Sequence, residues 1–276
     1  MKLSISNLAW DVREDDAVAR LLASLGVRCV DVAPGKYFPR LAEATDAEVL
    51  AVRRAWSDRG FAIFGMQSLL FGTAGLNVFG PPEVQDRMLA HLDAACRVGA
   101  LLGAGQLVFG SPANRDRRGL SDEQAVDLAI PFFRRLGDVA AKWGVAVCLE
   151  PNPARYGANF MITTHETARV VEQVDHPAIR LQCDTGALWC DTEPSEDTVP
   201  RLAHLVGHLH LSEPGLRTLG DSCLDHARMS VLVRDAFPGR ILCIEMLAST
   251  TEPHLSAVER AVRFAQLVYG ATDHGS

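Results

Sequence analysis

The sequence predicts an α/β fold, a single (β/α)8 TIM barrel domain over residues 1–276. Eight short β-rich runs recur along the 276 residues, separated by segments with helical spacing of apolar residues. Strict alternation of strand and helix implies parallel strands joined by crossover helices, and eight such units close into a barrel. A doubly wound open sheet would instead carry a glycine-rich phosphate loop after its first strand, where this chain reads LAWDVRED.

Each expected strand is a short apolar run. They cover residues 2–7, 28–32, 61–66, 105–110, 145–150, 179–184, 206–211 and 241–246. Several helical segments end in a glycine just before the next strand, as at Gly26, Gly60 and Gly144. Glycine suits the left-handed position that follows a helix, so these residues mark helix ends.

Composition and charge restrict the class of protein. Apolar residues make up 48% and charged residues 22%, and the net charge is −7, which argues against broad affinity for nucleic acid or anionic membrane. No apolar run reaches the length of a bilayer span, and the N-terminus MKLSISNLAWD is expected to be a strand and not a signal peptide. Seven cysteines without a CxxC pair indicate no zinc ribbon or redox pair, and a reduced cytoplasm is the expected compartment.

Ligand-type residues stand at the ends of the last four expected strands. Side chains of a barrel strand alternate between the interior and the helix layer, and chemistry collects at the C-terminal ends. This alternation points four of them inward: Glu150, Asp184, His210 and Glu245. Alone, a strand-end glutamate is more often a helix cap or loop ion pair, but four ends in the same phase predict one shared site. His208, one layer below His210, is expected to pack beneath the site and not to bind the ion.

The donor set indicates the kind of ion. Three carboxylates packed together repel one another and raise one another's pKa values unless a cation is present. Hard oxygen ligands with one imidazole suit Mn²⁺, Mg²⁺ or Co²⁺ better than a structural zinc ion. We therefore expect one divalent metal ion as the cofactor.

The same segments resemble the xylose isomerase-like TIM barrel superfamily, especially its sugar phosphate isomerase/epimerase branch, which includes ketose 3-epimerases. The resemblance covers nearly the whole chain. It is carried by Asn7, Trp10 and the segments MQSLLFG (66–72), LEPNP (149–153), CDTG (183–186), HLHLSE (208–213) and IEM (244–246). It implies that Glu150, Asp184, His210 and Glu245 bind the metal and that the two glutamates are the acid/base pair. It further implies a carbohydrate-like small-molecule substrate and a homodimer.

The chemistry of that branch needs two carboxylates. Removing a proton next to a carbonyl creates an enediolate whose oxygens a divalent cation stabilises, and a base and an acid act on the carbon. Two positions depart from the family pattern. Ala187 stands where a histidine usually follows the metal-binding aspartate, and Gly157 where a glutamate usually follows the first catalytic glutamate. Because both missing groups handle substrate hydroxyls in the family, the departures argue against a free ketohexose substrate.

Further residues are candidates for substrate binding. Trp10, Gln67 and Phe71 follow early strands and are expected either to form a wall for the substrate or to anchor loops. Arg217 matches, within one residue, an arginine that such enzymes aim at substrate oxygens; alternatively it is a solvated loop charge. His226 lies in the loop that enters the seventh helix, and it is expected either to line the pocket, which is slightly favoured, or only to lie near the helix start.

These features bear on four possible functions. The sequence favours a metal-dependent isomerase or epimerase acting on a sugar, sugar phosphate or related polyol. A metal-dependent dehydratase, a lyase, would use the same residues and stays open. An abasic-site endonuclease needs a three-metal cluster and a basic DNA-binding face, which Ala187 and the acidic charge disfavour. A non-catalytic barrel would be expected to lack one of the four ligands, and all are present.

Overall fold

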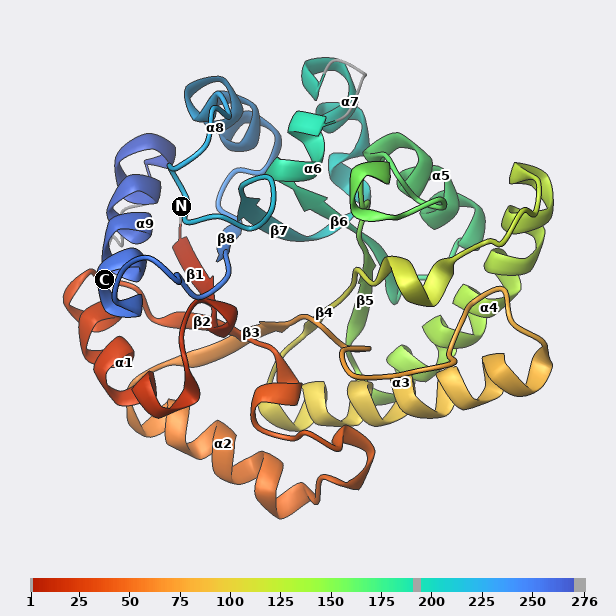
Figure 1. Ribbon diagram of the computed structural model, residues 1–276, viewed down its shortest axis with the longest axis horizontal. Coiled ribbons are helices and arrows are strands. Elements are labelled where there is room, and N and C mark those ends of the chain that lie inside the picture. The colour runs from red at the N-terminus through yellow and green to blue at the C-terminus, as the bar shows by residue number, and fades with distance from the viewer. Residues whose placement is uncertain (1, 191–194, 271–276) are drawn as a thin grey trace.

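The chain forms a closed eight-stranded barrel. The computed structural model describes residues 2–190 and 195–270. All strands are parallel and pair in chain order, and β8 pairs with β1 to close the ring (Figure 1). They are β1 (Lys2–Ser6), β2 (Cys29–Val32), β3 (Ala62–Met66), β4 (Gln106–Phe109), β5 (Ala146–Leu149), β6 (Ile179–Asp184), β7 (Val206–Ser212) and β8 (Ile241–Glu245). The predicted barrel is confirmed, and every expected strand boundary lies within one residue of the observed one.

Helices surround the barrel as an outer layer (Figure 1). They are α1 (Asp15–Ser24), α2 (Asp46–Asp58), α3 (Pro82–Leu102), α4 (Asp122–Trp143), α5 (Thr164–Val174), α6 (Thr185–Cys190), α7 (Ser195–Leu202), α8 (His226–Ala236) and α9 (His254–Tyr269). Local sequence sets their ends: Ser121 and Gln124 form a capping box at the start of α4, and Gly144 ends it with φ of 69°. None of the described helices has the length and hydropathy required to cross a membrane.

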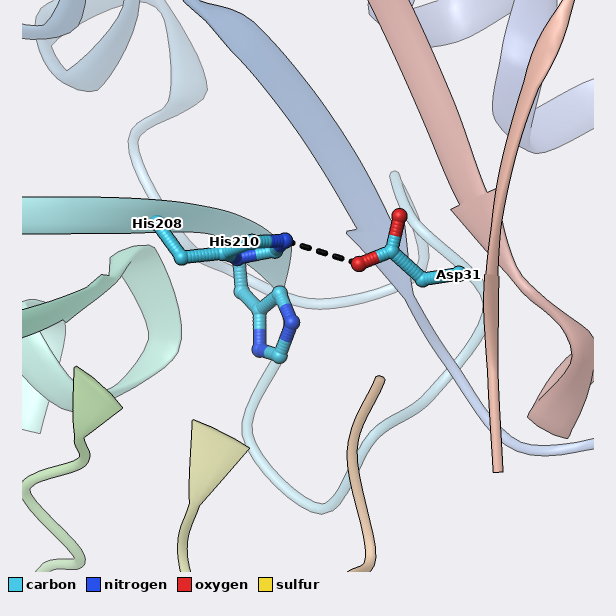
Figure 2. A group of neighbouring side chains, drawn as sticks. All are labelled: Asp31, His208 and His210. Atoms are coloured by element: carbon cyan, nitrogen blue, oxygen red, sulfur yellow. Dashed lines mark hydrogen bonds and ion pairs between the residues drawn. The ribbon is translucent and has the colours of Figure 1, made fainter. Parts of the chain in front are cut away.

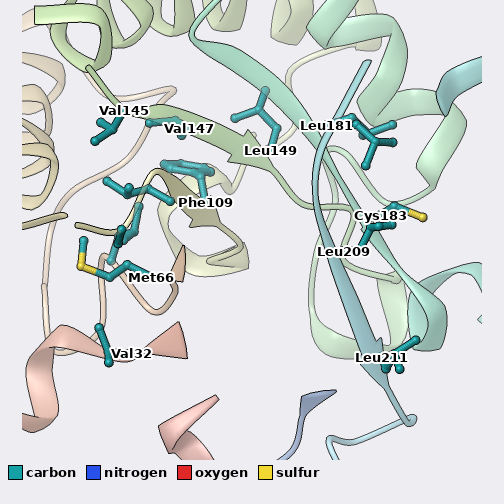
Figure 3. Packing of buried hydrophobic residues seen from close by; sticks show 14 of the residues in the cluster. Val32, Met66, Phe109, Val145, Val147, Leu149, Leu181, Cys183, Leu209 and Leu211 are labelled. Atoms are coloured by element: carbon teal, nitrogen blue, oxygen red, sulfur yellow. The ribbon is translucent and has the colours of Figure 1, made fainter. Parts of the chain in front are cut away.

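The hydrophobic core lies between the strands and the helices. Alternate side chains of β5, β6 and β7 join one buried cluster with residues from other strands (Figure 3), among them Val147, Leu149, Leu181, Leu209 and Leu211. The residues between them in sequence, including Cys148, Gln182 and His208, are buried but lie outside that cluster. The alternation expected from the sequence therefore separates an apolar outer face from a more polar barrel interior.

Candidate active site

Four ligand-type side chains converge at the C-terminal mouth of the barrel. Glu150 directly follows β5, Asp184 ends β6, His210 lies near the end of β7 and Glu245 ends β8. One ligand atom from each of them lies within 4.8 Å of those of the other three. Nδ1 of His210 is 3.1 Å from Oε2 of Glu245 and 3.5 Å from Oε1 of Glu150. The structure thus brings together all four residues that the strand pattern selected.

The electrostatics of this cluster fit a bound cation. Burial, and then the carboxylate of Glu150, raises the pKa of Asp184 to about 7. Burial alone would lower the pKa of His210, but the carboxylates of Glu245 and Glu150 raise it well above its ordinary value. In Asp184 the neighbouring carboxylates add to the effect of burial, and in His210 they outweigh it, as crowded negative charge does. The set of three carboxylates and one imidazole fits a divalent cation, which would supply the missing positive charge.

A buried arginine that the sequence did not single out binds the backbone of Glu150. Arg115 is fully buried and donates hydrogen bonds to the carbonyl oxygen of Glu150 (2.8 Å) and to Oδ1 of Asn152 (2.5 Å). Asn152 in turn donates to Oε2 of Glu150 at 3.4 Å. A Cβ atom on Gly110, just past β4, would come within 1.8 Å of that same oxygen. The absence of a side chain at Gly110 therefore leaves room for the Glu150 carboxylate.

Asp184 and His210 are also held by neighbours in the barrel. The backbone N–H of Ala187 donates to Oδ1 of Asp184, and the hydroxyl of Ser212 donates to Oδ2, both at 2.6 Å. With its amide nitrogen facing His208, Gln182 donates to Nδ1 of His208 (3.2 Å) while its oxygen accepts from the backbone N–H of His210 (3.2 Å). Nε2 of His210 has no hydrogen-bond partner among the described residues.

A polar network lies directly beneath the site. Nε2 of His208 contacts Oδ2 of Asp31 at 2.7 Å (Figure 2), and the hydroxyl of Ser4 donates to Oδ1 of Asp31 at 2.5 Å. The ring of His208 packs edge-on against that of His210, with 4.9 Å between ring centroids. Asp31, His208 and His210 are close enough to share an ion. Since Asp31 and His208 already bind each other, however, we interpret them as the support on which His210 rests.

A cavity of about 550 Å³ opens above the carboxylates, a volume typical of small-molecule sites. Of the substrate-binding candidates, Gln67 and Phe71 line it, and Oε1 of the buried Gln67 has no hydrogen-bond partner among the described residues. Trp10, Arg217 and His226 are not among the lining residues.

These three candidates have other surroundings. Trp10 is fully buried and donates to Oδ1 of Asp15 at 2.8 Å, and Arg217 is exposed. His226 is buried between the Tyr269 hydroxyl and the Glu213 carboxylate, each at 2.8 Å. The alternatives of loop anchor for Trp10 and solvated charge for Arg217 therefore agree better with their placement.

Of the two departures from the family pattern, Ala187 lines the cavity, whereas Gly157 is exposed on a turn with φ of 82°.

Glu213 is a further carboxylate at the cavity that the sequence did not single out. It is buried and lines the cavity. Its Oε1 accepts hydrogen bonds from the backbone N–H of Gly220 (2.6 Å) and from His226. Its Oε2 has no partner among the described residues. The HLHLSE motif contains this glutamate, but only the folded loop shows that His226 acts on it.

Known proteins were compared with the chain in sequence and in structure. Residues 19–266 match the family model of the xylose isomerase-like TIM barrel, and no curated protein matches the chain. A crystal structure of D-psicose 3-epimerase superposes with a TM-score of 0.78 at 17% identity, covering 98% of this chain and 100% of that one. L-ribulose 3-epimerase gives 0.80 at 14% identity with both chains fully covered. The 3-keto-D-glucoside 4-epimerase of E. coli gives 0.79 at 16% identity, covering 97% and 99%. These TM-scores show a shared fold. Because the family model matches residues 19–266, the chain belongs to the xylose isomerase-like TIM barrel family.

Proposed function

We propose that the chain is a divalent-metal-dependent isomerase or epimerase that acts next to a carbonyl of a sugar, sugar phosphate or related polyol. The observation that carries this proposal is the meeting of Glu150, Asp184, His210 and Glu245 in one cluster, whose three carboxylates line the cavity. The similarity in fold to sugar epimerases supports the same class of reaction. The proposed cofactor is Mn²⁺, Mg²⁺ or Co²⁺.

Glu150 and Glu245 are the proposed acid/base pair. They come from β5 and β8, which are separated around the ring by β6 and β7, so their carboxylates approach the cavity from different directions. One accepts the proton from the carbon next to the carbonyl, and the other returns a proton. Glu150, Asp184, His210 and Glu245 would together hold a divalent cation, which when bound would supply positive charge next to the reacting carbonyl.

Neighbouring residues hold Glu150 and the metal ligand Asp184 in place. Arg115 and Asn152 bind the backbone and side chain of Glu150, and Ser212 and Ala187 bind Asp184. Fixed orientation matters because a general base must stay within hydrogen-bond reach of the proton that it removes.

The test is proton exchange in D₂O. The protein is stripped with a chelator, reloaded with Mn²⁺, Mg²⁺ or Co²⁺ and incubated with ketoses, sugar phosphates and keto-glycosides. We expect deuterium uptake at a carbon next to the carbonyl, detected by NMR, and a product of unchanged mass apart from deuterium. Loss of water from the product would instead indicate a dehydratase. Absence of exchange with every compound and ion would contradict the proposal.

Two variants assign the roles. Glu150→Gln and Glu245→Gln are each expected to lower the exchange rate by about 10²–10⁴, whereas Glu123→Gln, on the exposed face of α4, leaves it unchanged. Full exchange in either site variant would refute the paired role of the two glutamates.

A further inference from the structure

The charges that line the cavity indicate what kind of substrate enters it. Four carboxylates face it, from Glu150, Asp184, Glu213 and Glu245. Among the described residues that line it there is no lysine, arginine or histidine. The nearby Arg155 instead lies over the ring of Tyr156, 5.8 Å from its centroid. A phosphate ester carries nearly two negative charges at neutral pH and is bound by arginine, lysine or backbone N–H groups. Three of these carboxylates are proposed metal ligands, but the fourth, Glu213, and the absence of a basic side chain from the described lining still favour a neutral molecule over a phosphate ester.

The rim of the same cavity is apolar and exposed. Phe71 is 84% exposed, Leu247 50% and Tyr156 43%, and all three line the cavity. They come from three separate loops, which follow β3, β8 and β5. Exposed apolar side chains that gather at one site, in contrast to scattered ones, mark a binding surface. Because these side chains surround the same cavity as the carboxylates, a substrate whose carbonyl lies at the carboxylates would contact this apolar surface with its other end.

The rim loops are fixed to one another by hydrogen bonds. The backbone N–H of Gly215 donates to the Tyr156 hydroxyl at 2.9 Å, which joins the loops after β7 and β5. The backbone N–H of Leu247 donates to the carbonyl of Leu216, also at 2.9 Å. Because the Tyr156 hydroxyl and the Leu247 backbone are engaged in this way, their apolar parts are held at the cavity before any ligand arrives.

We propose that the cavity takes a neutral carbonyl compound with an apolar substituent, such as an alkyl or aryl keto-glycoside, whose substituent lies against Phe71, Tyr156 and Leu247. The carbonyl end of this assignment rests on the proposed function. The apolar end rests on the rim alone, so binding can test it without turnover.

The test compares three ligands by equilibrium dialysis against the Mn²⁺-loaded protein: phenyl 3-ketoglucoside, methyl 3-ketoglucoside and 3-ketoglucose 6-phosphate. Each buried methylene strengthens binding about fourfold, so we expect the phenyl compound to bind at least about tenfold tighter than the methyl compound. The phosphate is expected to bind most weakly. A phosphate that binds as tightly as the phenyl compound, or equal binding of the two glycosides, would overturn the proposal.

Variants of the rim residues test whether these side chains cause the tighter binding of the phenyl compound. Phe71→Ser and Leu247→Ser are each expected to weaken binding of the phenyl compound at least about threefold while leaving the methyl compound unchanged. Leu267→Ser is the matched control, because Leu267 is also 84% exposed but lies on α9 outside the lining. Sedimentation of Phe71→Ser tests whether the rim is instead an interface between copies of the chain. If this variant dissociates a dimer and keeps the phenyl preference, the rim is an interface between copies of the chain, and the proposal is wrong.

The two proposals fail separately. Binding in the predicted order without deuterium exchange would contradict only the proposed function. If deuterium exchange occurs but is faster with the phosphate than with the phenyl compound, only the proposed substrate class is contradicted.

Discussion

Asp184→Asn is expected to stabilise the protein when no metal is bound. Asp184 is buried among the carboxylates of Glu150 and Glu245, and its pKa rises from 3.8 to about 7. Asparagine keeps the oxygen that accepts from the N–H of Ala187, and its amide can donate to the Ser212 hydroxyl. The substitution thus removes one negative charge from a crowded group of carboxylates while preserving the shape of the side chain.

The pKa shift gives the magnitude and the pH window. A carboxyl group whose pKa is raised on folding costs no stability below the unfolded value of 3.8, where both states are protonated. The cost grows as the pH rises and is complete above about 7. At about 1.4 kcal/mol per unit, a shift of roughly three units corresponds to ~4 kcal/mol at pH 8. We therefore expect Asp184→Asn to gain about 1 to 4 kcal/mol at pH 8, and less than half of that gain at pH 5.

The assay is urea unfolding in the presence of a chelator at pH 5 and pH 8. Asp31→Asn is the matched control, a buried aspartate that is bound to His208 and Ser4. It is expected to lose about 1 to 3 kcal/mol, because asparagine keeps only one acceptor oxygen and cannot bind both Ser4 and His208 as the carboxylate does. With saturating Mn²⁺ we expect the opposite order of stability, in which wild type is more stable than Asp184→Asn. An Asp184→Asn variant less stable than wild type in chelator at pH 8, or a gain equal at both pH values, would refute the account of crowded carboxylates.

Three further outcomes follow from the site. Saturating Mn²⁺ is expected to raise the Tm of wild type by about 5 °C or more, and by more at pH 8 than at pH 5 because bound ligands must be deprotonated; calorimetric scans measure both. Gly110→Ala is expected to weaken metal binding at least about tenfold by displacing the carboxylate of Glu150. The control Gly105→Ala lies at the other end of β4, has nothing within 4 Å of its added Cβ and is expected to leave metal binding unchanged. Equal metal affinities of the two variants in a titration would contradict the steric argument. Arg115→Gln is expected to cost about 1 to 3 kcal/mol of stability and to lower kcat more than it changes KM; an unchanged kcat would show that Arg115 does not position Glu150.

The sequence predicted the barrel and the location of the candidate site because both depend on regular geometry. Strand alternation has a period of two, so the phase of apolar residues such as Leu149 and Leu181 determines that Glu150 and Gln182 point inward. The closed parallel ring then brings strand ends that are distant in sequence to one mouth. No knowledge of loop conformation is required for either inference.

Loops follow no such period, and there the sequence was less informative. Trp10 and Arg217 were candidates for substrate contact by their proximity to strands, yet neither lines the cavity. Arg115 reaches Glu150 from a loop thirty-five positions earlier in the chain, and no spacing rule connects them. His226 faces Glu213 because of how the loop after β7 folds. Such contacts depend on loop conformation, which local patterns leave undetermined.

The most direct test of the central claim is metal stoichiometry by titration calorimetry of the chelator-stripped protein with Mn²⁺. We expect one ion per chain for wild type and for the surface control Asp127→Asn. We expect binding at least about tenfold weaker for each of Glu150→Gln, Asp184→Asn, His210→Gln and Glu245→Gln. A wild-type protein that binds no divalent ion, or site variants that bind it as tightly as wild type, would show that these four side chains do not hold a common cation.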